Sequence, residues 1–212
     1  IYSEVMKSHQ RSSIGNATIE EYMSREFKKP KNFESLLYVS QILQADGIRT
    51  AIEAHRRNKA SCMGSLYWQL NDCWPGASWS GIDYYGKWKA LHYNVKKAFK
   101  PVIISHEFID SNLHVSLVSD LKEAFIGEVE ISLMPFNGDS IIQVWKQQVS
   151  LKPFEASTIL TIFKSELPKF ENKKQSYLKL VLKEKGEIIS FKNVYFLPFK
   201  DLKIANPEIE YK

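Results

Sequence analysis

The chain has 212 residues, of which 44% are hydrophobic and 25% are charged, and a formal net charge of +5. This composition is ordinary for a folded globular protein and excludes extensive disorder. The basic residues are scattered among acidic ones rather than gathered in one stripe, so nucleic-acid binding is not expected. No apolar stretch is long enough to cross a bilayer and no signal peptide is visible, so a membrane partner is not expected either.

The first hundred residues are predicted to be mainly helical. A short helix is expected over residues 18–27. It is expected to end before Pro30, because a proline disfavours helical backbone in the residue that precedes it. A long amphipathic helix is expected over residues 32–57, where apolar residues recur at spacings of three and four. Asn32 or Ser35 is expected to cap its start.

A nearly continuous apolar run follows at residues 63–70. Such a run predicts a strand buried on both faces, as in a parallel sheet covered by helices. A polar loop and a third helix over residues 87–99 come next, and the order of helix, strand, loop and helix is typical of an α/β barrel or a doubly wound sheet. Cys62 and Cys73 lie on either side of the predicted strand, too far apart for a disulfide, and are expected to be free thiols.

After Pro101 the hydrophobic pattern changes to a period of two. Turn-forming residues separate the predicted strands, which span residues 113–117, 128–133, 141–149, 157–163, 177–182 and 188–196. About seven short strands over about a hundred residues describe a β-sandwich of immunoglobulin-like size. The fold class is therefore predicted to be α/β followed by all-β.

Four of the five tryptophans lie close together in the sequence, at Trp68, Trp74, Trp79 and Trp88. Trp88 is interpreted as part of the apolar face of the third helix, whereas Trp74 and Trp79 lie in the polar loop. In α/β barrels the site is built where strands end and loops begin. Aromatic rings pack on the C–H face of a sugar while amides and carboxylates bind its hydroxyls, so Trp68 with Asn71 and Asp72 indicates a sugar site. Two alternatives stay open: the tryptophans pack the barrel mouth, or Asp72 caps a turn.

Residues 67–72 read Tyr-Trp-Gln-Leu-Asn-Asp, residues 78–80 read Ser-Trp-Ser, and residues 85–89 and 91–93 read Tyr-Gly-Lys-Trp-Lys and Leu-His-Tyr. This succession resembles the last barrel strand and the following helix of the β-mannosidases of glycoside hydrolase family 2. Residues 53–57, which read Glu-Ala-His-Arg-Arg, also resemble the segment before that strand, notably in bacterial members. The resemblance implies that residues 1–101 are the C-terminal part of a (β/α)8-barrel catalytic domain. Residues 102–198 would then be the immunoglobulin-like β-sandwich behind it, and residues 199–212 a linker to a further domain.

The resemblance further implies a fragment of a retaining exo-β-mannosidase, which removes terminal non-reducing β-D-mannose residues by means of two glutamates. The family carries its acid/base in an Asn-Glu motif and its nucleophile in a Ser-Glu-(Tyr/Phe)-Gly motif, and neither is present here. Glu4 follows Ser3, but Val5 replaces the aromatic residue, so Glu4 is not assigned as the nucleophile. No catalytic residue is expected in this chain, which is expected to be inactive alone.

The residues carried over from the family bind substrate, a β-mannoside oligosaccharide or glycoside. Trp68 is the hydrophobic platform of the cleavage subsite, Asn71 and Asp72 are polar residues at the same strand end, and Trp74 is a wall of the pocket. No metal or cofactor is expected. The unpaired strand edges of a truncated barrel favour self-association of the chain. The compartment stays open, although a bacterial relative would be periplasmic or secreted.

Two alternatives to a β-mannosidase are kept. One is another exo-glycosidase of family 2, such as an exo-β-glucosaminidase acting on chitosan-type chains, which acceptance of the axial 2-hydroxyl would distinguish. The other is a non-catalytic carbohydrate-binding or interaction module centred on the sandwich, where Trp145 and Tyr177 are the aromatic residues expected to be exposed.

Overall fold

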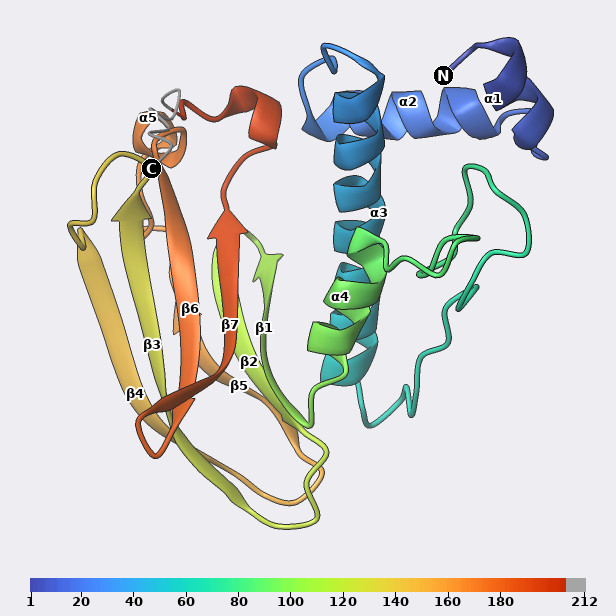
Figure 1. Ribbon diagram of the computed structural model, residues 1–212. Coiled ribbons are helices and arrows are strands. Elements are labelled where there is room, and N and C mark those ends of the chain that lie inside the picture. The colour runs from blue at the N-terminus through green and yellow to red at the C-terminus, as the bar shows by residue number, and fades with distance from the viewer. Residues whose placement is uncertain (205–212) are drawn as a thin grey trace, which may run out of the picture. The chain divides into compact units, whose positions relative to one another are not determined.

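The computed structural model describes residues 1–204 and divides into two compact units with their boundary between Lys100 and Pro101. The first unit contains the helices (Figure 1), namely α1 (Glu4–His9), α2 (Gly15–Glu26), α3 (Phe33–Arg57) and α4 (Ala90–Ala98). The long helix is confirmed, and Asn32 caps it by accepting a hydrogen bond from the Ser35 backbone N–H at 2.8 Å. The helix before it begins three residues earlier than predicted, and the third predicted helix is shorter than expected.

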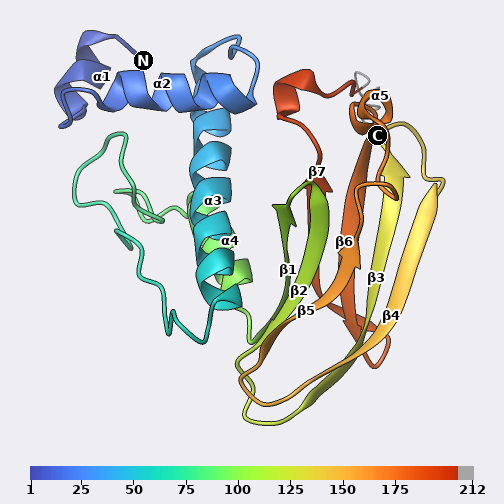
Figure 2. The same cartoon turned by 180° about the vertical axis from the view of Figure 1, so that it is seen from behind.

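Helix α3 is the element around which the first unit is built. Helix α2 lies across its first turns, and α4 runs beside its C-terminal half (Figures 1 and 2). Ile52 of α3 and Leu91 and Val95 of α4 are buried together, with Tyr67 packed against them. Because α4 follows the aromatic loop directly, this packing fixes one end of that loop.

Charged groups are also buried along α3. The guanidinium of Arg49 donates to the carboxylate of Glu53 at 2.6 Å, and the Glu53 side chain is only 2% exposed. Arg56 donates to the carbonyl of Ala98 and, at 2.9 Å, to that of Lys100. Arg56 thereby satisfies carbonyl groups left unpaired at the end of α4.

The predicted strand at residues 63–70 is wrong. In the first unit the described residues form only isolated bridges, of Ile82 with Asn71 and with Trp88. Leu66 and Trp68, expected to be buried, are exposed. A strand of a parallel sheet needs neighbouring strands to pair its N–H and C=O groups, and the described part of this unit supplies none.

The second unit is a β-sandwich (Figure 1), whose described residues contain the strands β1 (Val102–Ile109), β2 (Asn112–Ser119), β3 (Phe125–Pro135), β4 (Gln143–Leu151), β5 (Ala156–Ile162), β6 (Ser176–Glu184) and β7 (Glu187–Tyr195). They form two antiparallel sheets, ordered β1-β2-β5 and β4-β3-β6-β7. The all-β prediction is thus confirmed, and the six predicted strands are β2 to β7. Strand β1 was missed because its first four residues are all buried, so that its apolar residues do not alternate with polar ones.

Two short helical segments complete the second unit, α5 (Phe170–Lys173) and the 3-10 helix η1 (Phe199–Asp201). Leu202, directly after η1, is buried. Most of the predicted linker, residues 205–212, lies outside the described residues.

The core of the sandwich lies between the facing sheets. Every second residue of the central strands points into it, including Val129 and Ile131 of β3 and Leu178 and Leu180 of β6. Burying a side chain of this size stabilises a fold by about 1.5–3 kcal/mol. The alternation that predicted the strands is therefore the alternation that builds this core.

Gly127 of β3 supplies a test of this packing. A Cβ atom there would lie 2.5 Å from the carbonyl oxygen of Lys183 and 2.8 Å from the ring of Phe125. Because a backbone carbonyl cannot move cheaply, Gly127→Ala is expected to lower the free energy of unfolding by about 1–3 kcal/mol, measured by urea titration. Ile126→Thr, at the exposed neighbouring position, should change it by less than about 0.5 kcal/mol. Equal effects of the two substitutions would contradict this account.

Among the described residues, no helix combines the length and the apolar character that a membrane span requires. Cys62 and Cys73 are free cysteines.

Candidate functional site

Residues 69–82, which follow Trp68 and contain Trp74 and Trp79, form a closed loop. Backbone hydrogen bonds of 2.9–3.0 Å join Gln69, Leu70 and Asp72 to Gly81 and Ile82 across its neck. A further bond of 2.9 Å runs from the Lys89 N–H to the carbonyl of Gly81, so the loop is also joined to the residue that precedes α4. The loop is therefore anchored at both ends, independently of any sheet.

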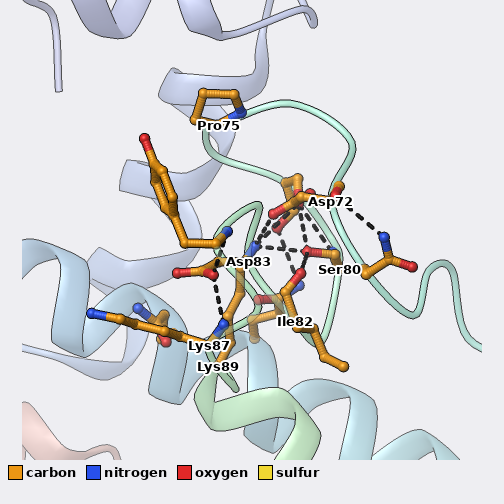
Figure 3. Close-up of polar contacts among 12 residues, drawn as sticks. Asp72, Pro75, Ser80, Ile82, Asp83, Lys87 and Lys89 are labelled. Carbon is orange, nitrogen blue, oxygen red and sulfur yellow. Dashed lines mark hydrogen bonds and ion pairs between the residues drawn. The ribbon is translucent and has the colours of Figure 1, made fainter.

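A buried cluster of charged and hydroxyl groups fills the inside of the loop (Figure 3). The Asp72 carboxylate accepts a hydrogen bond from Lys89 Nζ at 2.7 Å and one from Ser78 Oγ at 2.5 Å. Lys89 Nζ also donates to Ser80 Oγ at 2.8 Å and to Ser78 Oγ at 3.2 Å. The side chains of Asp72 and Lys89 are 4% and 12% exposed, so this is a buried ion pair.

The environment of Asp72 favours its charged form. Burial raises the pKa of the carboxyl group, but hydrogen bonds from Lys89, Ser78 and Ser80 outweigh burial, and the pKa lies below its ordinary value of 3.8. The Asp72 carboxylate thus binds both the ammonium of Lys89 and the hydroxyl group of Ser78. The cluster joins the inside of the loop to the residue that precedes α4.

Asp72 is expected to stabilise the fold to an extent that changes with pH. Since its folded-state pKa is lowered, the carboxylate contributes stability above the unfolded pKa, and the contribution is lost as the pH falls through the folded pKa. The difference in thermal midpoint between wild type and Asp72→Asn should therefore shrink between about pH 6 and pH 3. Circular dichroism measures both midpoints, with exposed Asp139→Asn as the control. A difference that grows on acidification would refute the assigned sign.

The predicted substrate-binding residues occupy different parts of this loop. Trp68, whose peptide bond to Gln69 is cis, is 72% exposed, and Trp74 is 47% exposed. Asn71 is exposed, and its amide donates to the carbonyl of Asp72 at 3.3 Å. Asp72 is instead turned inward onto Lys89. The aromatic faces and the Asn71 amide are thus accessible from solvent, whereas the Asp72 carboxylate is engaged within the loop.

Trp74 also has contacts from the start of the chain. The ring centroid of Trp74 lies 5.0 Å from that of His9, and the guanidinium carbon of Arg11 lies 5.4 Å from the Trp74 centroid. His9 Nδ1 also forms a hydrogen bond with the carbonyl of Pro75. These contacts were not predicted, because nothing in the local sequence links residues more than sixty positions apart.

Two other residues were considered from the sequence, Trp88 and Glu4. Trp88 precedes α4 and is 43% exposed, so its interpretation as a buried residue of the helix is wrong. Its ring packs edge-on against those of His92 and Tyr93, with centroids 4.3 Å and 5.2 Å away. Glu4 lies on the exposed surface of α1, paired with Lys7 at 3.1 Å. The described residues contain no group of three or more His, Cys, Asp and Glu side chains that could hold a metal ion.

Known proteins similar to this chain are β-mannosidases and other exo-acting glycosidases. The family model of the mannosidase Ig/CBM-like domain matches residues 111–201. Beta-mannosidase A of Emericella nidulans is 35% identical over 116 residues, which cover 52% of this chain and 12% of that protein. The chain thus spans about an eighth of the length of such curated relatives.

Solved structures extend the similarity to both units. The crystal structure of a β-D-mannosidase from Dictyoglomus thermophilum matches 97% of this chain and 25% of its own, with 30% identity and a TM-score of 0.89. An exo-chitosanase from Amycolatopsis orientalis matches 82% of this chain and 21% of its own, with a TM-score of 0.67. At 20% identity, the second match concerns the fold alone.

Proposed function

From the chain's relationship to the β-mannosidases of glycoside hydrolase family 2, we propose that it is part of a retaining exo-β-mannosidase and supplies a wall of the sugar site. The enzyme would hydrolyse terminal non-reducing β-D-mannose residues of oligosaccharides or glycosides. Its two glutamates would lie outside this chain, because the family's glutamate motifs do not occur here. By itself this chain would be inactive.

The observation that carries the proposal is the closed loop with its exposed tryptophans. Aromatic side chains that gather at the surface are frequent at ligand and partner sites. Trp68 would stack on the apolar face of the mannosyl ring, Trp74 would form a wall of the pocket, and the Asn71 amide would bind a hydroxyl group. Asp72 would contribute through the loop that its carboxylate holds.

The helical unit would be the C-terminal part of a (β/α)8 barrel, and residues 102–198 would be the immunoglobulin-like domain that follows it in the sequence. Apolar side chains exposed in the first unit, such as Leu66 and Leu70, would be covered by the other parts of the barrel. Without those parts they would favour self-association of the isolated chain.

A substrate panel tests the specificity of the longer protein, meaning the proposed enzyme of which this chain is a part. Aryl β-mannoside and aryl β-glucosaminide differ at position 2, where mannose carries an axial hydroxyl. The proposal expects kcat/KM to favour the mannoside by at least about a hundredfold, or about 2.7 kcal/mol. Preference for the glucosaminide would favour the second candidate, another exo-glycosidase of family 2 such as an exo-β-glucosaminidase.

The sandwich offers less support for a separate carbohydrate-binding module. Trp145 packs against the core rather than facing solvent. Tyr177 stacks on Phe136, with ring centroids 5.4 Å apart, and lies next to Tyr195. The two aromatic residues expected to be exposed are therefore both partly buried and packed against other side chains of the sandwich.

A further inference from the structure

We propose that Lys89 is a positioning residue for the sugar site, acting from the start of α4 to hold the closed loop and the tryptophans that it carries. This inference rests on the proposed function and adds to it a residue that touches no sugar. Lys89 would act through Asp72, Ser78 and Ser80, which bind its ammonium from inside the loop.

The burial of Lys89 is the first argument. Lysine is almost never fully buried unless it is paired, since removing an ammonium from water is costly. Here three acceptors surround Nζ at 2.7–3.2 Å, and Ser80 at the centre is fully buried. Replacing such an ion pair with apolar groups is often neutral or even stabilising. A contribution to stability alone is therefore a weak explanation for its presence, and fixing one loop conformation is a better one.

The connectivity is the second argument. The backbone N–H of Lys89 binds the carbonyl of Gly81, and the Gly81 N–H binds the carbonyl of Gln69, the residue directly after Trp68. The side chain of Lys89 meanwhile reaches Ser78 and Ser80 on either side of Trp79. One residue thus links α4 to both the neck and the interior of the loop (Figure 3).

The anchoring of α4 is the third argument. Leu91 and Val95 are buried against α3, so the backbone at Lys89 starts from a rigid element. A side chain fixed in this way transfers the rigidity of the helix pair to the loop. When the residues that support a site shift by about 1 Å, the rate of the reaction can fall about a hundredfold.

The test replaces Lys89 with methionine in the longer protein, which removes the charge and keeps the length of the side chain. Lys89→Met is expected to raise KM for an aryl β-mannoside about tenfold or more while kcat falls less, because binding in the positioned site is lost. Exchange of the backbone amide hydrogens of residues 72–82, followed by mass spectrometry, should become faster. Lys96→Met, on the exposed side of the same helix, should change neither quantity.

A second variant separates positioning from stability. In Asp72→Asn/Lys89→Met no unpaired charge is left in the cluster, so the thermal midpoint should recover relative to Lys89→Met, whereas KM should stay high. Wild-type KM together with wild-type amide exchange in Lys89→Met would overturn the inference, as would recovery of KM with the midpoint in the double variant. If the wild-type protein itself hydrolyses no β-mannoside, the proposed function fails instead, and amide exchange alone decides whether Lys89 orders the loop.

Discussion

Replacing Trp68 with alanine in the longer protein is expected to lower kcat/KM for an aryl β-mannoside by about a hundredfold, or about 2.7 kcal/mol of transition-state stabilisation. Trp68 presents a side chain that is 72% exposed next to a neck held by backbone hydrogen bonds. The neck fixes the backbone next to Trp68, and the exposed ring offers the apolar face of the sugar a flat surface. Steady-state kinetics of purified variants measure the effect.

Two further variants test whether the effect is specific to the aromatic ring of Trp68. Trp68→Phe keeps an aromatic face and should retain activity within about tenfold of wild type. Trp79→Ala removes another exposed tryptophan of the same loop, 58% exposed, and should alter kcat/KM by less than about threefold. If Trp68→Ala and Trp79→Ala lose activity equally, the assignment of Trp68 as the platform is wrong.

Replacing Glu53 with alanine is expected to lower the free energy of unfolding of the helical unit by about 3–5 kcal/mol. The Glu53 side chain is 2% exposed and lies 2.6 Å from the guanidinium of Arg49, which is itself 17% exposed. Removing the carboxylate leaves a cation in a largely dry environment without its partner on the next turn, and this loss exceeds the net value of the intact pair. Urea titration followed by tryptophan fluorescence reports on this unit, because four of the five tryptophans lie in it.

The control for Glu53 lies on the same helix. Glu34→Ala removes an exposed carboxylate from the first turn of α3 and should cost less than about 1 kcal/mol. Glu53→Gln keeps the shape and the hydrogen bonding of the side chain and should fall between the two. A Glu53→Ala variant as stable as Glu34→Ala would show that the buried pair contributes little to the unit.

The sequence predicted those elements whose residues repeat with a clear period. The alternation of β3 and β6 gave correct strands because their two faces meet different environments, core on one side and solvent on the other. Strand β1 lacks that contrast, since residues 102–105 are all buried. The strand predicted at residues 63–70 was wrong for a different reason. Their apolar composition indicated burial, but a strand also needs neighbouring strands to pair with, and the described part of the unit contains none.

One contiguous sequence motif indicated the candidate site, and its role in sugar binding stays a prediction. That motif indicated the loop with Trp68, Asn71, Asp72 and Trp74. It did not decide whether Asp72 caps a turn or faces the substrate. The structure adds Lys89, seventeen residues away, as the partner of Asp72. It also adds His9 and Arg11 beside Trp74. Such contacts between distant positions depend on the packing of α1, α3 and α4, which a local pattern does not encode.

The central claim is that this chain supplies a wall of a mannoside site whose catalytic carboxylates lie elsewhere. The most direct measurement is hydrolysis of an aryl β-mannoside by residues 1–212 alone and by the product of the complete gene, at equal concentration and with folding checked by circular dichroism. The account predicts turnover by the complete product and none by residues 1–212. Turnover by residues 1–212, or a folded complete product that leaves the mannoside intact, would contradict it.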